Sequence, residues 1–223
     1  MRYGTTIGKK FYEDGTIKHY PGCTVVADVT PECPAYEVML GLRQMLIDAG
    51  FEKDMILLPT DSYHMTVIRG LNDYVREDAF WPEKLPKDTP MTKVDDYVSA
   101  AVASVPALGK IRMKFKNTFA TDGCLMIRLV PEDDAQEKIL RDYRDQVATA
   151  IGLFLPRHAT YNFHISLAYV RVVPEGENRV RYEKMLADME AYMANRPAFE
   201  ITPPYMAYYD DMLAYHPERI PRD

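Results

Sequence analysis

Runs of apolar residues divide the first part of the chain into strand-like and helix-like segments. The β-branched residues over 24–29 predict a buried strand. Apolar residues at helical spacing predict a helix over 36–49, with Gly50 placed to end it. Extended segments at 55–58 and 63–68 follow, the second with alternating side chains. We therefore expect a strand, a helix and two short strands in this part.

A similar order returns later in the chain. Alternating residues over 111–119, a turn at 121–123 and an apolar run over 124–130 predict a β-hairpin. The longest amphipathic pattern predicts a helix over 132–151, and 161–170 is again an apolar strand. The other segments predicted are a charged, proline-rich loop or insertion at 71–92, helices at 95–105 and 178–195, and short strands at 199–201 and 206–209.

This repetition suggests two similar halves. Segments 24–69 and 124–170 share the order strand, helix and histidine-containing strand, without visible sequence identity. Short, hairpin-like connections favour antiparallel pairing, so the expected fold class is α+β. We expect a bilobal, pseudo-twofold arrangement of mainly antiparallel sheets, with helices on the outer faces and a central cleft. Residues 1–223 would form one domain with lobes at about 24–69 and 111–170 and an insertion at about 71–92.

Composition and charge narrow the function classes. Lys and Arg number 27 against 33 Asp and Glu, a net charge of −6, so the chain lacks the cationic footprint that grips a long nucleic acid. The start has no secretory pattern, and no apolar run reaches the roughly 18–20 residues of a membrane span. We expect a cytoplasmic protein that contacts no membrane. Cys23, Cys33 and Cys124 lack metal-site spacing and are expected to be reduced, although Cys23 and Cys33 could pair.

Two strands carry the same short pattern, a histidine followed two residues later by a hydroxyl. They are Tyr63-His64-Met65-Thr66-Val67 and Phe163-His164-Ile165-Ser166-Leu167. Because side chains alternate along a strand, each histidine and its hydroxyl project from one face, about 6–7 Å apart. With the halves related by a twofold axis, the four side chains would lie on opposite walls of one cleft, with room for a phosphate between them.

This set of side chains suits attack on a phosphodiester without a metal ion. One neutral imidazole takes a proton from water or a hydroxyl, and the other, as imidazolium, gives a proton to the leaving oxygen. The hydroxyls donate to the non-bridging oxygens. A histidine pKa near 6.5 lets both protonation states coexist near neutral pH. Either histidine can take either role, and the roles exchange with the direction of the reaction.

Other residues near the motifs offer weaker signals. Tyr63 and Tyr161 could stack on a base, and Arg69 and Arg157 could neutralise phosphate, although alternation points Tyr63 and Arg69 away from the face of His64. With 16 tyrosines in the chain, plain packing explains these residues better. The triplet His158-Ala159-Thr160 also matches, but it lacks flanking alternation and is expected in a loop. The run 205–211 could add an aromatic wall, and His19 and His216 are assigned no role.

The simpler alternatives are a structural histidine pair and a metal site. A single histidine on an apolar strand is usually a core residue, but a matched pair with hydroxyls argues against that interpretation. Two histidines without a neighbouring carboxylate or cysteine make an incomplete zinc set. No glycine-rich nucleotide loop, zinc-protease or serine-hydrolase motif is present. We therefore expect no metal and no cofactor.

The paired motifs in a chain of this size resemble the 2H phosphoesterase superfamily, which includes RNA 2′,5′-ligase-like proteins and cyclic phosphodiesterases. The segment 10–24 is also similar to a poorly characterised bacterial branch of it. The resemblance implies that His64 and His164 are catalytic and that Thr66 and Ser166 bind phosphate. It implies hydrolysis of a cyclic or 2′-linked phosphodiester in a small nucleotide or RNA terminus by a monomer. A non-catalytic nucleotide-binding module with the same cleft is the alternative.

Overall fold

The computed structural model describes residues 1–222. Its strands are β1 (Gly22–Asp28), β2 (Met55–Leu57), β3 (His64–Ile68), β4 (Ile111–Ala120), β5 (Cys124–Pro131), β6 (His164–Val170), β7 (Phe199–Ile201) and β8 (Tyr205–Tyr209). Its α-helices are α1 (Pro34–Asp48), α2 (Met91–Ala103), α3 (Asp134–Ile151) and α4 (Glu177–Met193), with short 3₁₀ helices η1 (Thr60–Ser62) and η2 (Asp78–Phe80).

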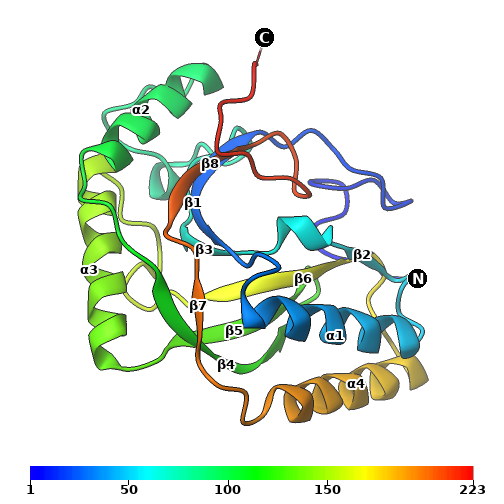
Figure 1. The fold of residues 1–223 in the computed structure, drawn as a ribbon. Coiled ribbons are helices and arrows are strands. Elements are labelled where there is room, and N and C mark those ends of the chain that lie inside the picture. The colour runs from blue at the N-terminus through cyan, green and yellow to red at the C-terminus, as the bar shows by residue number, and fades with distance from the viewer. Residues whose placement is uncertain (223) are drawn as a thin grey trace.

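All eight strands belong to one curled sheet (Figure 1). The order is β7-β4-β5-β6-β3-β1-β8, with β2 paired to β6 beside this path. Each pair of neighbours is antiparallel. The predicted α+β class with antiparallel pairing is therefore confirmed. The two similar halves form the two ends of this single sheet along its strand order, and they meet where β3 pairs with β6.

The helices pack in two pairs against the outside of the sheet. Figure 1 shows α1 beside α4 at the lower right and α2 above α3 at the left, and both pairs are in contact. The segment before β1 and the segment after β8 lie at the upper right, away from α3.

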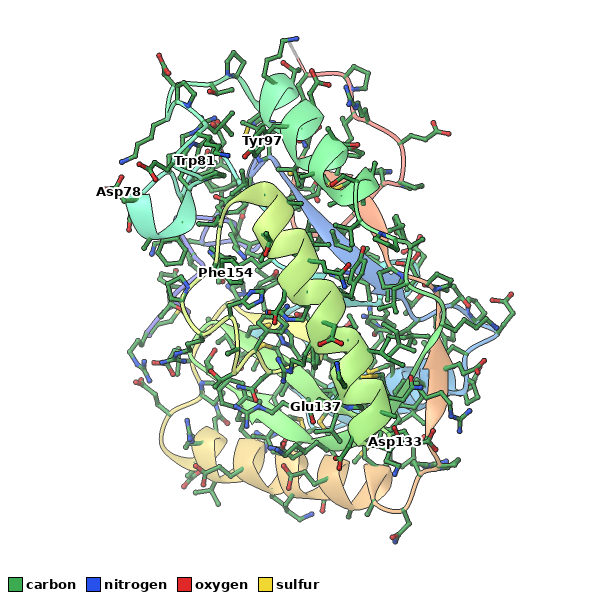
Figure 2. The ribbon with its side chains drawn as sticks, turned by 90° about the vertical axis from the view of Figure 1, so that its left-hand side faces the viewer. Asp78, Trp81, Tyr97, Asp133, Glu137 and Phe154 are labelled. Carbon is green, nitrogen blue, oxygen red and sulfur yellow. The ribbon has the colours of Figure 1, made fainter. Side chains whose placement is uncertain are left out.

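Helix α3 shows how the sequence sets these elements. The side chain of Asp133 caps its start by accepting from the backbone N–H of Gln136, and Gly152 ends it with a φ of 75°. Leu140, Val147 and other apolar residues on one face are buried. In Figure 2, Asp133 lies at the start of α3 and Tyr97 of α2 near its other end, where the Tyr97 hydroxyl donates to a backbone carbonyl of α3.

Most predicted boundaries lie within two residues of the observed ones, with two exceptions. Helix α2 begins at Met91 and not at residue 95, because Pro90 precedes it and can occupy a helix start. Strand β6 begins at His164 and not at residue 161, because the preceding residues leave a turn. The predicted loop at 71–92 is a loop as far as residue 90, with one 3₁₀ turn at η2.

Two further expectations concern disulfide pairing and membrane-spanning helices. Cys23, Cys33 and Cys124 are free thiols in the described residues, and Cys23 and Cys33 are not paired with each other. In residues 1–222, none of the helices combines the length and apolar character needed to cross a membrane.

Candidate active site

The two motif histidines are the first residues of the two central strands. Met65 of β3 pairs with Ile165 of β6, and both are fully buried in the core. Because the strands are antiparallel and side chains alternate, His64 and His164 flank this pair on the opposite face of the sheet. The predicted walls facing each other across a cleft are therefore wrong. The histidines lie on adjacent strands of one continuous sheet.

The hydroxyl residues complete a four-residue cluster on this face. With Met65 opposite Ile165, the register places Thr66 across from His164 and Ser166 across from His64. Each histidine is therefore beside the hydroxyl of the other motif as well as on the same strand as its own. All four side chains therefore project from one face of the sheet.

Each imidazole is held by a backbone carbonyl two residues earlier. His64 Nδ1 is 2.8 Å from the carbonyl oxygen of Ser62, and His164 Nδ1 is 2.8 Å from that of Asn162. A carbonyl oxygen only accepts, so Nδ1 carries the hydrogen in both rings. In the neutral ring, Nε2 is then the unprotonated nitrogen. Each histidine therefore offers Nε2 for proton transfer.

Burial lowers the pKa of both histidines. The pKa of His64, which is 9% exposed, falls to about 4, and the positive charge of His164 adds to this effect. The pKa of half-buried His164 is also lowered, first by burial and further by the charge of Arg128. The bonds to the carbonyls of Ser62 and Asn162 oppose both shifts. Both imidazoles are therefore mainly neutral at pH 7 when no ligand is bound.

A cavity of about 340 Å³ lies over this cluster, and we call it the histidine pocket. All four motif side chains line it. The other lining residues come from the ends of the chain, from the loops after β3 and before β6, and from neighbouring strands: Lys10, Tyr20, Thr24, Leu58, Arg69, Gly70, Asn72, Tyr161, Tyr169, Tyr209, Met212 and Tyr215. Five tyrosines and two cations therefore surround the four motif residues.

Lys10 brings a buried positive charge to this pocket. Its ammonium lies 5.2 Å and 5.1 Å from the ring centres of Tyr20 and Tyr169, which is cation–π geometry. Burial lowers its pKa to about 8, and the charge of Arg69 acts in the same direction. Because burial has already removed part of the solvation of this ammonium, pairing with an anion costs little further desolvation. No local motif marks Lys10, so the sequence alone assigned it no role.

The predicted supporting residues divide into those that reach a cavity and one that does not. Tyr161 and Arg69 line the histidine pocket, and Arg157 lines an adjoining cavity. Tyr63 is 1% exposed and packs edge-on against Tyr36, with ring centres 6.3 Å apart. The suggested stacking of Tyr63 on a base is therefore wrong, because the side chain points into the core.

Arg69 departs from its predicted position, whereas His158 does not. Arg69 was expected to point away from His64, but β3 ends at Ile68, so strand alternation no longer applies to it. His158 lies in a loop, as predicted, and its Nε2 is 2.8 Å from a carboxylate oxygen of Asp145. It lines the adjoining cavity and not the histidine pocket.

Tyr215 is a second residue that the sequence did not single out. Its ring centre is 4.1 Å from that of His64, with the planes tilted by 54°. Burial raises the pKa of its hydroxyl, which therefore stays protonated. The contact joins positions far apart in the chain, and only the folded structure reveals it.

Among residues 1–222, no cluster of three or more His, Cys, Asp or Glu side chains is arranged to hold a metal ion.

Comparison with known proteins places these features in a family. A family model described as "2H-phosphodiest: Domain of unknown function (DUF1868)" matches residues 10–123. A crystal structure of a conserved protein of unknown function from Agrobacterium tumefaciens has 26% identity and a TM-score of 0.86, covering 97% of this chain and 92% of that one. LigT of E. coli, solved with ATP, has 9% identity and a TM-score of 0.47, covering 90% and 96%. No curated protein matches the sequence.

Proposed function

Because the chain belongs to the 2H phosphodiesterase family, we propose that it hydrolyses a cyclic or 2′-linked phosphodiester in a nucleotide or an RNA terminus. The observation that carries this proposal is the histidine pair at the start of β3 and β6. Both rings hold their Nδ1 hydrogen on a backbone carbonyl and lie on one face of the sheet with two hydroxyls. Phosphoesterase activity in general fits the family.

The two histidines would divide the proton transfers. The pKa of His64 falls to about 4, so this ring is neutral over most of the pH range, and we assign it the base that takes a proton from the attacking water. His164 would give a proton to the leaving oxygen as the P–O bond breaks. The negative charge of a bound phosphodiester favours the protonated form of His164. The new P–O bond and the released hydroxyl complete the hydrolysis.

The remaining groups would stabilise the charge that develops on phosphorus. Thr66 and Ser166 would donate to the non-bridging oxygens from the same face of the sheet. Lys10 and Arg69, which also line the pocket, would supply positive charge there. The chemistry needs no metal ion in this scheme. We further propose that the chain works as a cytoplasmic monomer on small substrates.

A nucleotide-binding module without catalysis is the second candidate. One observation favours it: both histidines have lowered pKa values, so at pH 7 both rings of the empty pocket are mainly neutral and little imidazolium is present to act as an acid. Calorimetry that shows tight binding of a mononucleotide, together with no turnover of any phosphodiester, would select this function.

Turnover of 2′,3′-cyclic nucleotides and 2′,5′-linked dinucleotides in the presence of EDTA tests the enzyme proposal. We expect His64→Ala and His164→Ala each to lower kcat by about 10²–10⁴-fold, the usual contribution of a positioned proton carrier. His19→Ala is the matched control, because the His19 side chain is 70% exposed and lines no cavity described above. Full activity of either motif variant, or loss of all activity in EDTA, would contradict the proposal.

A further inference from the structure

A second cavity of about 270 Å³ adjoins the histidine pocket. The two cavities share four residues, Arg69, Gly70, Tyr161 and His164. The rest of the second cavity is formed by the end of β3 and the loop after it, by the end of α3 and the loop that follows it, and by β4 and β5. A ligand whose phosphodiester lies at His164 therefore has a direct way into this second space.

Four arginines line the second cavity, and we call it the arginine pocket: Arg69, Arg128, Arg144 and Arg157. Among residues 1–222, no aspartate or glutamate lines it, and none of these arginines forms an ion pair with a carboxylate. Arg128 pairs directly with His164 across β5 and β6. Positive charge therefore collects next to the proposed acid in a chain whose net charge is −6.

Arg144 is the most informative of the four, because it is only 3% exposed. Its guanidinium donates to the carbonyl oxygens of Val67 and His158 and lies 4.4 Å from the ring centre of Tyr161. Burial lowers its pKa to about 10, so it is still charged at pH 7. Carbonyl dipoles hold this charge without neutralising it, and a buried charge without a counter-ion is unfavourable. An anionic ligand is the natural partner.

Much of the remaining lining of the arginine pocket is apolar. Its lining includes a phenylalanine, a methionine and several aliphatic residues: Phe119, Met126, Ala148, Ile151, Leu153, Leu155 and Pro156. The guanidinium of Arg128 lies 3.8 Å from the ring centre of Phe119, which gives the wall a flat, cationic edge. Such a surface suits a base or another flat apolar group next to an anion.

We propose that the arginine pocket binds a second phosphoryl group of the substrate together with the nucleoside that carries it. The substrate is then a linked dinucleotide with an additional phosphate on its leaving nucleoside, and not a cyclic mononucleotide. This inference rests on the proposed function where it places the scissile phosphodiester at His64 and His164. The binding of the second phosphoryl group rests on the arginines alone.

The first experiment compares a 2′,5′-linked dinucleotide with and without a 3′-phosphate on its leaving nucleoside. We expect the phosphate to raise kcat/KM of the wild-type protein at least about tenfold, as expected for hydrogen bonds to a charged group. Arg128→Gln and Arg157→Asn should each bring the ratio of the two kcat/KM values toward one. Asn is chosen at 157 because the backbone there has a φ of 64°, which Asn tolerates.

Arg179→Gln is the matched control. It removes the same charge from the exposed surface of α4, where Arg179 pairs with Glu183 and lines neither cavity. The ratio should keep its wild-type value in this variant. Turnover of both dinucleotides at equal kcat/KM, unchanged in Arg128→Gln, would overturn the inference and leave the proposed function standing.

A binding measurement tests the arginine pocket independently of the proposed hydrolysis. Calorimetry on His64→Ala compares adenosine 3′,5′-bisphosphate with adenosine 5′-phosphate, since His64 does not line the arginine pocket. Tighter binding of the bisphosphate that Arg128→Gln abolishes supports the arginine pocket, even when no substrate is turned over. Equal affinity for both nucleotides argues against it, whatever the activity.

Discussion

At the scale of single residues, the two histidines are set by the backbone and not by neighbouring side chains. Each Nδ1 is bound to the carbonyl oxygen two residues earlier, at Ser62 and Asn162. A residue two positions before a strand can offer its carbonyl whatever its side chain. The tautomer of both rings therefore depends on the local path of the chain, which the two halves share.

Activity should have an acidic pH optimum. In the proposed function His164 acts as the acid and must be protonated, and its pKa lies below the ordinary 6.5, so we expect kcat/KM to be greater at pH 5.5 than at pH 7.5. Because the charge of Arg128 lowers this pKa, Arg128→Gln should move the alkaline limb to higher pH. A pH profile of kcat/KM measures the shift, and Arg179→Gln should leave the limb in place. An alkaline optimum would contradict the assignment of His164 as the acid.

Protonation of His64 should destabilise the fold at low pH. Its pKa is about 4 in the folded chain and about 6.5 when unfolded, so the unfolded state binds more protons between these values. The free energy of unfolding should fall as the pH drops from 6.5 to 4, at about 1.4 kcal/mol per unit of pKa difference at most. Urea unfolding at pH 7.0 and 4.5 should show a smaller loss in His64→Gln than in the wild type. An equal loss would mean that His64 does not titrate with folding.

Local pattern located some site residues and missed others for a physical reason. His64 and His164 were predictable because the two-residue alternation of a strand fixes which side chains share a face. Arg69 was misplaced because the alternation holds only as far as β3 extends. Lys10 and Tyr215 reach the pocket through the ends of the chain. Contacts of that kind leave no periodic signal in the sequence.

At the scale of elements, the backbone just after β3 lies very close to β1. A Cβ placed on Gly70 would lie 1.9 Å from the carbonyl oxygen of Cys23, which is backbone and cannot move aside. We expect Gly70→Ala to lower the free energy of unfolding by at least about 2 kcal/mol, in the range of an overpacked core. Activity should fall as well, because Gly70 lines both cavities.

Gly109→Ala is the control for this change. Nothing lies within 4 Å of a Cβ at Gly109, so its stability should stay within about 1 kcal/mol of the wild type. Urea unfolding of the two variants gives the comparison directly. Equal stability of Gly70→Ala and Gly109→Ala would show that the contact between Gly70 and the backbone of β1 is looser than described.

Elements were more predictable than their arrangement. Helix α3 could be bounded within two residues, because amphipathic spacing and a glycine at its end act locally. The pairing of β3 with β6 joins residues a hundred positions apart, at Met65 and Ile165. Nothing local specifies such a pair. It follows from burying the core faces of both halves together, which turned the expected facing walls into one sheet.

At the scale of the whole molecule, the net charge conceals a strong local asymmetry. The chain carries −6 overall, yet Lys10, Arg69, Arg128, Arg144 and Arg157 gather at two connected cavities. Composition argued against a grip on a long nucleic acid, but it could not show where the cations lie. An anionic surface with a cationic cavity favours a short substrate that enters the cavity completely.

This arrangement makes a prediction about salt. The screening length shortens from about 30 Å at 0.01 M to about 8 Å at 0.15 M ionic strength, so the attraction of an anionic substrate to the cavities should weaken over this range. We expect kcat/KM to fall as salt rises, mainly through KM, because the proton transfers at the histidines occur after binding. The charge of Arg157 is exposed and is therefore screened most strongly by salt. The kcat/KM of Arg157→Asn should depend less steeply on salt than that of the wild type. Arg179→Gln should keep the wild-type slope, because its charge lies away from both cavities. A kcat/KM that rises with salt would mean that the net negative charge governs the approach of substrate, and that the cavity cations do not.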